Sequence, residues 1–259
     1  SQMSPPLLQA RNLAVEIAGQ RVTGGLDLQI EAGQRLAILG RNGAGKSTLL
    51  ATLAGLRTPA GGSIELGGRP YVLLSAREAA LRRAWLGQAH ADPFGSTVLE
   101  TALTGRHPHL GRWDWESKRD AEIARSALDA VGLVGLEQRQ IHTLSGGERQ
   151  RLALATLLAQ ATPLYLLDEP LAHLDLNHQM AVLELFAGAA RDCGAGVVMV
   201  LHDPALAYRF CDLALLIDGN GHSELGPVDA VLTAEKLSAL YGYRLREFQD
   251  SGHRCFIPV

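Results

Sequence analysis

Nine residues from position 40 combine glycines, a lysine and two hydroxyl side chains in a spacing that suits phosphate binding. The glycines would let backbone N–H groups turn inward around phosphate oxygens, and a helix beginning after them would add the partial positive charge of its N-terminus. We expect Lys46 to reach the β- and γ-phosphates of a nucleotide and the Ser47 hydroxyl to bind Mg²⁺. The alternative is a glycine-rich turn with an exposed lysine, but the apolar run before the segment and the helical pattern after it argue against that. The candidate phosphate-binding residues are Gly40, Arg41, Asn42, Gly43, Ala44, Gly45, Lys46, Ser47 and Thr48.

Two acidic residues follow the apolar run at residues 164–167, and their chemistry complements that of the phosphate loop. Phosphoryl transfer to water needs a metal ion and an oriented nucleophile. We expect Asp168 to hold Mg²⁺ through water and Glu169 to polarise the attacking water. Many strands end in acidic turns, so the pair alone is a weak signal, but a phosphate loop earlier in the same chain strengthens it.

A third segment, Ser145-Gly146-Gly147-Glu148, stands at the start of a predicted helix over residues 147–160. Ser145 and Glu148 have the spacing of a capping box, in which each side chain accepts a hydrogen bond from the other residue's backbone N–H. Capping alone does not explain two glycines, because each disfavours a helix by about 1 kcal/mol relative to alanine. A helix N-terminus without obstructing side chains is an anion site. We therefore expect Ser145 and the neighbouring N–H groups to face a γ-phosphate.

The three segments occur in the order phosphate loop, Leu-Ser-Gly-Gly-Glu-Arg-Gln and Leu-Leu-Asp-Glu-Pro, which resembles the order in the ATP-binding cassette (ABC) ATPases. The resemblance covers essentially the whole chain, and the heptapeptide is specific to that family. It implies ATP hydrolysis with Mg²⁺ by a head-to-tail homodimer that holds two ATP molecules between its subunits. In that arrangement the phosphate loop of one chain faces Ser145, Gly146 and Gly147 of the other.

The resemblance also implies roles for single residues elsewhere in the chain. Gln88 is similar to the Q-loop glutamine, which touches Mg²⁺ and water and joins a helical subdomain to the core. Asp175 resembles the D-loop aspartate at the nucleotide, and His202 resembles the switch histidine that holds the γ-phosphate and Glu169. The implied catalytic residues are Lys46, Gln88, Glu169 and His202. The implied metal-site residues are Ser47, Gln88 and Asp168.

Two positions depart from the family pattern. Ile17 stands where many members have an aromatic residue that stacks on adenine. Since base–aromatic stacking is worth roughly 1–3 kcal/mol per base in nucleic-acid systems, we expect weaker ATP binding and less discrimination among nucleotides. Ala172 replaces a residue with a hydrogen-bonding side chain before the D-loop, which we expect to weaken communication between the two ATP sites.

The elements that must position these residues follow from the apolar pattern. Runs that are apolar on both faces at residues 36–39, 164–167 and 197–201 predict buried parallel strands. Each run ends in polar residues, at the edge of the sheet where ligands bind in open α/β folds. Helical patterns follow these strands and favour an α/β class. The predicted helices cover residues 46–56, 147–160 and 178–191.

We predict one ABC ATPase domain over residues 1–259, with a mostly parallel sheet in its core and an inserted α-helical subdomain. The first 35 residues and residues 63–74 are typical of short strands in an N-terminal antiparallel β layer. The predicted parts are a core with its β layer from residues 1–91 and 146–221, a helical subdomain at 92–145 and a C-terminal tail at 222–259.

Local signals support two of these parts. In the helical subdomain, residues 120–131 place apolar side chains on one helical stripe. In the tail, Thr233 and Gly242 predict the start and the end of a helix over residues 233–240. Two short strands are expected around residues 250–252.

Composition limits the classes of protein to which the chain can belong. With 47% hydrophobic and 20% charged residues, its 259 residues can build a sizeable core, which excludes intrinsic disorder. The net charge of -3 shows no basic footprint, so we expect no nucleic-acid partner. No apolar stretch is long enough to cross a membrane, and the first residues lack the pattern of a signal peptide. Cys193, Cys211 and Cys255 have no metal-ligand spacing and predict free thiols in a reducing compartment.

Residues 104–113 resemble the Gly-Arg-x-Pro-His-Leu stretch of ATPases that serve importers of iron siderophores, haem and cobalamin. The C-terminal residues 240–254 resemble the same subfamily, and the cobalamin branch is the most similar. The resemblance implies a peripheral protein at the cytoplasmic face of the inner membrane, bound to two transmembrane permease subunits. A periplasmic substrate-binding protein would act indirectly. We expect Arg106 and His109 to matter more for coupling to the permease than for basal hydrolysis.

Alternatives stay open for this region and for the whole chain. Residues 104–113 could form an exposed loop without a special role, and Trp113 and Trp115 could either contact a partner or pack within the helical subdomain. The chain could serve an exporter, act as a soluble ABC ATPase on DNA or ribosomes, or bind nucleotide without turnover. A soluble ATPase would usually bring a coiled-coil insertion or tandem cassettes, and a module without turnover would lack Lys46 or Glu169.

Overall fold

The computed structural model describes residues 5–88, 95–111 and 114–259, and Trp113 lies outside the described residues. The strands are β1 Leu8–Ile17, β2 Gln20–Ile30, β3 Arg35–Leu39, β4 Gly61–Leu66, β5 Arg69–Pro70, β6 Arg83–Leu86, β7 Leu164–Asp168, β8 Gly196–Val200, β9 Leu213–Ile217, β10 Ser223–Pro227, β11 Leu245–Asp250 and β12 His253–Pro258. The α-helices are α1 Lys46–Leu53, α2 Ala76–Arg82, α3 Val98–Leu103, α4 Lys118–Ala130, α5 Gly146–Ala159, α6 Leu176–Cys193, α7 Pro204–Phe210, α8 Val228–Val231 and α9 Ala234–Tyr241. Short 3₁₀ helices are η1 Tyr71–Leu73, η2 Thr104–His109 and η3 Ile141–Thr143.

The central sheet has the order β10-β9-β3-β8-β7-β6, and all neighbours pair in parallel except β10 with β9. All five residues of β7 are buried, and its four apolar residues alternate between two cores. Leu164 and Leu166 pack on one side of the sheet, whereas Tyr165 and Leu167 pack on the other. This two-residue period explains why a strand covered on both faces is continuously apolar. The predicted α/β class with a mostly parallel sheet is confirmed.

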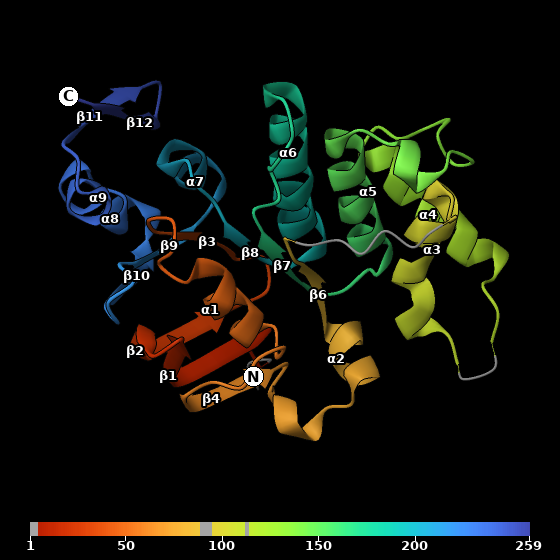
Figure 1. Ribbon diagram of the computed structural model, residues 1–259, viewed down its shortest axis with the longest axis horizontal. Helices are drawn as coiled ribbons and strands as arrows, with labels where there is room; N and C mark the ends of the chain where they lie inside the picture. The colour runs from red at the N-terminus through yellow and green to blue at the C-terminus, as the bar shows by residue number, and fades with distance from the viewer. Residues whose placement is uncertain (1–4, 89–94, 112–113) are drawn as a thin grey trace.

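A second sheet, with the order β2-β1-β4-β5, is antiparallel and lies against one face of the central sheet (Figure 1). Its strands β1 and β2 have 10 and 11 residues, so the expectation of short strands is wrong for them. The two strands pair along their whole length although the register shifts at three places, because buried apolar residues recur along both. Residues 71–73 are also not a strand. They form η1, which the Tyr71 hydroxyl anchors by donating to the Leu53 carbonyl oxygen at 2.8 Å.

The ladder between β1 and β2 contains a bulge beside the phosphate loop. Val15 is opposite Thr23 and Glu16 is opposite Arg21, so Val22 is an extra residue with no opposite number on β1. Val22 and Thr23 are consecutive and both buried, which a regular strand with one solvated face would not allow. The bulge therefore turns the Val22 side chain into the space between the two sheets.

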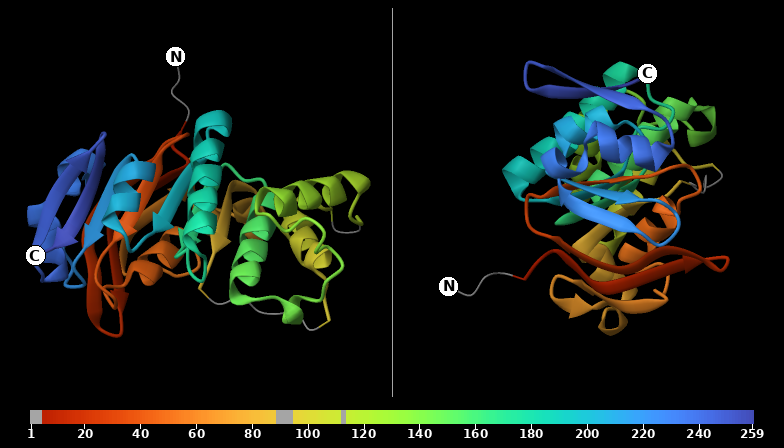
Figure 2. Two further views of the ribbon diagram at one scale, coloured as in Figure 1. Left: turned by 90° about the horizontal axis from the view of Figure 1, so that it is seen from above. Right: turned by 90° about the vertical axis from the view of Figure 1, so that its left-hand side faces the viewer.

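The helices divide between the two faces of the central sheet. Helix α1 packs between the sheets, against β1 and β2 on one side and β7 and β8 on the other. Helices α3, α4 and α5 pack on one another at one end of the molecule, away from the C-terminal hairpin (Figure 1, Figure 2). The sequence assigns α5 to the core, and the structure shows it in contact with α3 and α4. The division of the chain into parts at residues 92 and 146 stays a prediction.

The tail contains the predicted elements and two more, β10 and α8. Helix α9 is capped by the Thr233 side chain, which accepts a hydrogen bond from the Lys236 N–H at 3.3 Å, and ends at Gly242 with φ +69°. Strands β11 and β12 form an antiparallel hairpin, as expected around residues 250–252. Strand β10 was not predicted, and it pairs with β9 in the central sheet. Within the described residues, no helix is long and apolar enough to span a membrane.

Candidate nucleotide site

The phosphate loop connects the end of β3 to the start of α1 and depends on glycine for its shape. Gly43 and Gly45 have φ of +82° and +94°, in the left-handed region that a residue with Cβ rarely adopts. A Cβ on Gly45 would also lie 2.4 Å from a methyl carbon of Val22. Gly45 precedes α1 without a side-chain cap, so no side chain occupies the first N–H groups of the helix. These backbone donors can bind an anion.

Lys46 lies inside this loop and is 6% exposed. Its ammonium donates to the carbonyl oxygens of Gly40 at 2.7 Å and Arg41 at 3.0 Å, which fixes the loop around it. Burial lowers the pKa of Lys46, and the carboxylates of Glu169 and Asp168 oppose that shift. The ammonium is thus buried next to negative charge and held by backbone oxygens.

Asp168 ends β7 and is 3% exposed. Burial raises its pKa, and a hydrogen bond with the Ser47 side chain opposes the shift. One of its oxygens, Oδ1, is buried without a hydrogen-bond partner among the described residues. A buried acceptor without a donor is costly and is rare in native structures. An oxygen in this situation, beside a serine hydroxyl, fits a hard cation such as Mg²⁺.

Glu169 is the next residue, and the side chains of two other elements meet at one of its oxygens. His202 Nε2, just after β8, lies 3.1 Å from Glu169 Oε1. Gln88 Nε2, just after β6, lies 3.2 Å from the same oxygen and 3.1 Å from the Ser47 hydroxyl. Among the described residues, Glu169 Oε2 receives no hydrogen bond. This oxygen therefore keeps its capacity to accept a hydrogen bond.

The Ser145 segment forms the predicted capping box at the start of α5. The Ser145 hydroxyl accepts from the Glu148 N–H at 3.1 Å, and Glu148 Oε2 accepts from the Ser145 N–H at 2.8 Å. A Cβ on Gly147 would lie 3.0 Å from the His173 carbonyl oxygen, so the glycine allows the loop after β7 to pass close to α5.

Asp175 caps α6 on the other side of that loop. Its Oδ1 accepts from the His178 N–H at 2.9 Å and lies 2.8 Å from His178 Nδ1, and these bonds lower the pKa of Asp175.

The structure therefore brings together some of the sequence-predicted site residues and not others. The phosphate loop, Gln88, Asp168, Glu169 and His202 converge at the carboxyl edge of β3, β6, β7 and β8. Among the described residues, the side chains of Ser145 and Asp175 bond within the first turns of α5 and α6 and do not reach the phosphate loop. In Figure 1, α5 and α1 stand on opposite sides of β7.

Sequence reasoning missed Gln150, on the second turn of α5. Its side chain is 7% exposed, and Nε2 donates to the backbone oxygens of Glu169 at 3.4 Å and Pro170 at 3.1 Å. Gln150 is the last residue of the family heptapeptide, but it lies between Arg149 and Arg151 in a polar stretch and the sequence assigns it no role of its own. The nearest signal is its position on the helix, because Leu154 and Leu157, which are four and seven residues later, are buried.

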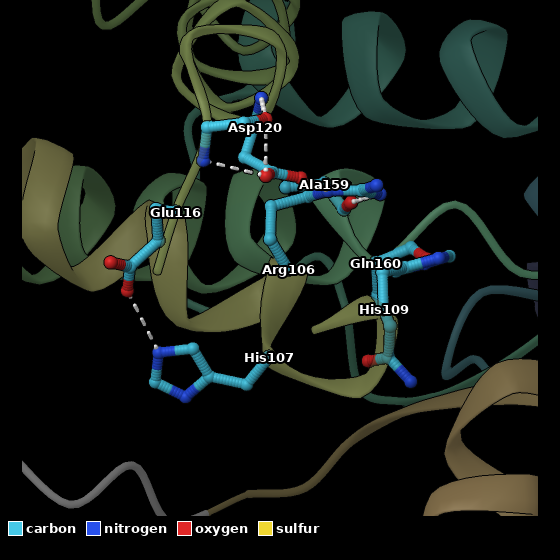
Figure 3. A network of polar contacts seen from close by, with 8 residues as sticks. Arg106, His107, His109, Glu116, Asp120, Ala159 and Gln160 are labelled. Atoms are coloured by element: carbon cyan, nitrogen blue, oxygen red, sulfur yellow. Dashed lines mark hydrogen bonds and ion pairs between the residues drawn. The ribbon is translucent and has the colours of Figure 1, made fainter. Parts of the chain in front are cut away.

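Residues 104–110 form a connected network rather than a free loop (Figure 3). The buried Arg106 pairs with Asp120 at 2.9 Å and donates to the Ala159 carbonyl oxygen at 2.8 Å. His109 Nε2 lies 2.6 Å from the Gln160 carbonyl oxygen. The expectation of an exposed loop is wrong for Arg106, because its guanidinium is buried and bonds to the start of α4 and the end of α5. Trp115 is 88% exposed, so it does not pack within the helical subdomain.

A cleft of about 770 Å³ opens from the catalytic edge toward the helices α3 and α5. Gln88 and Glu169 line its inner end, and Thr101, Thr104 and Thr156 line the part next to the helices. The cleft thus connects the proposed water-activating carboxylate with the surface between the sheet and the helical region.

The remaining expectations concern Ile17 and the cysteines. Ile17 ends β1 and is 38% exposed, so its side chain is available at the surface. Cys193, Cys211 and Cys255 are free thiols, as predicted. Burial raises the pKa of Cys211 to about 12, which keeps this thiol protonated and unreactive at neutral pH.

Comparisons with known proteins agree with this geometry. Residues 23–172 match the sequence profile of the ABC transporter family. The chain is 45% identical to the hemin import ATP-binding protein HmuV of Nocardia farcinica, over 97% of this chain and 89% of that protein. It is 42% identical to the protein of the same name from Deinococcus radiodurans, over 99% and 98% of the two chains. It is 38% identical to the cobalamin import ATP-binding protein BtuD of Halobacterium salinarum, over 92% of this chain and 59% of that protein.

Solved structures show the same fold. A chain of a transporter described as metal-chelate type, in an inward-facing conformation, has a TM-score of 0.85, 30% identity and 98% coverage of both chains. An ATP-binding cassette solved as a dimer with ADP and Pi has a TM-score of 0.75 and 22% identity, over 85% of this chain and 98% of that one. With the phosphate loop and the carboxylates of β7 at one sheet edge, these similarities show that the chain belongs to the ABC transporter family as an ATP-hydrolysing, ATP-binding subunit.

Proposed function

We propose that Glu169 activates the water that attacks ATP, and that the chain uses this hydrolysis to drive import through a membrane permease. The observation that carries the catalytic part is the convergence of Gln88 and His202 on one oxygen of Glu169. A carboxylate held at Oε1 presents Oε2 in a defined direction, and positioning is the main contribution of a protein to phosphoryl transfer.

The other residues at this edge bind and orient the triphosphate. Lys46 can exchange its two carbonyl partners for phosphate oxygens, and the free N–H groups at the start of α1 supply further donors. The backbone of Gly40–Thr48 shapes the cradle. His202 can hold both Glu169 and the terminal phosphate, because its ring has a second nitrogen. These groups hold the phosphates in line with the water that Glu169 orients.

Ser47 and Asp168, with Gln88 beside them, would hold Mg²⁺. The buried, unpartnered Oδ1 of Asp168 and the neighbouring Ser47 hydroxyl supply the oxygen ligands that this ion prefers. When bound, Mg²⁺ would neutralise charge on the phosphate oxygens. It would also lower the pKa of Asp168, which burial raises in the ion-free chain.

We further propose that the working unit is a homodimer with two shared ATP sites. The start of α5 at Ser145, Gly146 and Gly147 has donors that suit a nucleotide, and Asp175 lies at the start of α6. In the described part of the chain, their hydrogen bonds do not reach the phosphate loop. A second copy placed head to tail would bring them to the phosphates. Ala172 has no side-chain donor for a bond across this interface, so communication between the sites must use other residues.

The import role rests on the similarity to import ATP-binding proteins along nearly the whole chain, and on residues 104–110. We propose that two permease subunits dock at the cleft that leads from Gln88, on the cytoplasmic face of the inner membrane. A periplasmic protein would select the cargo. Haem is the first cargo to test, ahead of cobalamin and ferric siderophores. The alignments with the two hemin import proteins cover more of this chain, and more of the relative, than the alignment with the cobalamin import protein. The slightly acidic net charge gives no support for a nucleic-acid partner.

The test is ATP-driven uptake in vesicles that contain the cognate permease and binding protein. Haem, cobalamin and a ferric siderophore are supplied in parallel, and the Glu169→Gln variant is the blank. Haem uptake that disappears in the blank is the expected result. Uptake of another chelate alone would keep the mechanism and change the cargo. ATP hydrolysis with no uptake of any chelate would contradict the importer and favour an exporter or a soluble ATPase.

A further inference from the structure

We infer that Gln150 is a positioning residue for Glu169, through which the helix that begins at Ser145 holds the water-activating carboxylate of the same chain. The inference rests on the proposed role of Glu169. We call Gln150 a positioning residue because its hydrogen bonds are with backbone oxygens of the segment that carries Glu169.

The contact is specific and buried. Gln150 Nε2 donates to the Pro170 carbonyl oxygen at 3.1 Å and to the Glu169 carbonyl oxygen at 3.4 Å, and the side chain is 7% exposed. The Glu169 carbonyl oxygen also accepts from the Ala172 N–H at 3.1 Å, which closes a turn with Pro170 at its second position. The Gln150 amide group thus donates hydrogen bonds to two consecutive carbonyl oxygens of the turn that carries Glu169.

The turn needs such support. Glu169 has φ +49°, in the left-handed region that is unfavourable for a residue with Cβ. Pro170 has no N–H, so it cannot stabilise the turn with a backbone donor. A residue in this conformation persists only where its surroundings over-determine it. Gln88 and His202 fix the end of the Glu169 side chain, and Gln150 fixes the backbone from which that side chain extends.

The position of Gln150 on α5 links the start of this helix to the turn at Glu169. It lies five residues after Ser145, on the same continuous helix Gly146–Ala159. A shift of the helix N-terminus therefore moves the Gln150 amide, and with it the turn at Glu169. In the proposed homodimer the start of α5 faces the ATP held mainly by the other chain. Gln150 would then make the orientation of Glu169 in one ATP site depend on the nucleotide in the other site. Ala172 cannot provide this communication through its side chain, because it has no hydrogen-bond donor.

The test compares substitutions at Gln150 with a matched change at Gln160. Gln150→Met keeps the length of the side chain and removes the donor, whereas Gln150→His restores an N–H at a similar reach. Gln160 also donates one amide to two carbonyls, those of Ala80 at 2.6 Å and Arg83 at 3.1 Å, but it does not touch the turn at Glu169. The measurements on the full chain, alone and with its permease, are kcat, KM, the Kd for ATP by calorimetry and the melting temperature.

We expect Gln150→Met to lower kcat about 10- to 100-fold with KM and Kd within about twofold of wild type. Gln150→His should recover most of kcat, and Gln160→Met should leave kcat within about twofold although it lowers the melting temperature similarly. If Gln150→Met has wild-type kcat while Glu169→Gln is inactive, the inference is wrong and the proposed function stands. A parallel loss of kcat, ATP affinity and stability would also overturn it. If Glu169→Gln hydrolyses ATP normally, the proposed catalytic role fails, and the inference fails with it.

Discussion

The phosphate-loop edge and the network around Arg106 both contain buried charges, but they differ in how completely those charges are hydrogen-bonded. At the phosphate loop, Lys46 is held by backbone carbonyls and Asp168 keeps a buried oxygen without a partner. In the network, Arg106 and Asp120 face each other at 2.9 Å. Arg106 Nη1 donates to the Ala159 carbonyl oxygen, and Asp120 Oδ2 accepts from the N–H and the hydroxyl of Ser117, the cap of α4. Satisfied charges hold helices together, whereas incompletely satisfied ones leave bonding capacity for a ligand.

The first way to test this contrast is to remove the charge of Glu169. Glu169→Gln keeps the size of the side chain but removes the base, so kcat should fall by about 10²- to 10⁴-fold. ATP should still bind and hold two copies of the chain together. Steady-state hydrolysis and gel filtration with and without ATP measure the two effects. Wild-type turnover in this variant would assign the base to another residue.

The second test removes one partner of the satisfied pair. Arg106→Ala leaves Asp120 buried without its cation, which should lower the free energy of unfolding by about 3–5 kcal/mol. Urea denaturation measures this loss. His107→Ala is the control in the same segment, since its 3.4 Å contact with Glu116 is exposed and should be worth about 0–1 kcal/mol. Similar losses in the two variants would contradict the structural role of Arg106.

The same pair predicts a dependence on pH. Hydrogen bonds from Ser117 and the Arg106 guanidinium hold the pKa of Asp120 well below its usual range. A carboxyl with a lowered pKa stabilises the fold fully above its ordinary pKa of about 4, and this stabilisation is lost as the pH falls toward the folded pKa. The difference in unfolding free energy between wild type and Asp120→Asn, which cannot ionise at this position, should therefore shrink below about pH 4. A constant difference from pH 7 to pH 3 would rule out this ion pair as its cause.

The third test concerns the phosphate loop, where the buried charges are incompletely satisfied. Lys46→Ala removes the ammonium that the loop holds ready for phosphates, and ATP affinity should fall by about 10²-fold or more. Calorimetry on the variant measures the change. Unchanged affinity would show that the backbone N–H groups alone account for binding.

The smallest expected effect is a gain in ATP affinity from a substitution at the edge of the nucleotide site. Ile17 is half-exposed at the end of β1, at the position that the family pattern assigns to adenine stacking. Ile17→Tyr should tighten ATP binding by roughly 1–3 kcal/mol if the base lies against it. Triphosphate without a base is the control, because its affinity should not change. Equal changes for both ligands would place the base elsewhere.

Local sequence signals predicted much of the central fold and the positions of the phosphate loop and the β7 carboxylates. Their patterns are contained within a few residues, such as the apolar run before Asp168 and the glycine spacing before Lys46. Strand β6 was missed, because Arg83–Leu86 is short and only two of its four residues are buried. Gln150 was missed since its partners are about 20 residues away and are backbone atoms. Contacts of this kind leave no mark in composition or periodicity.

The bulge at Val22 gives the antiparallel sheet a part in shaping the nucleotide site. One inserted residue in the β1–β2 ladder places a branched side chain where a Cβ on Gly45 would collide with it at 2.4 Å. The shape of the phosphate loop therefore depends on contact with β2, a strand of the antiparallel sheet. Gly45 is therefore required twice, by its φ of +94° and by its contact with Val22. A register slip in the first hairpin, more than twenty residues upstream of Lys46, would propagate to the cradle of the phosphates.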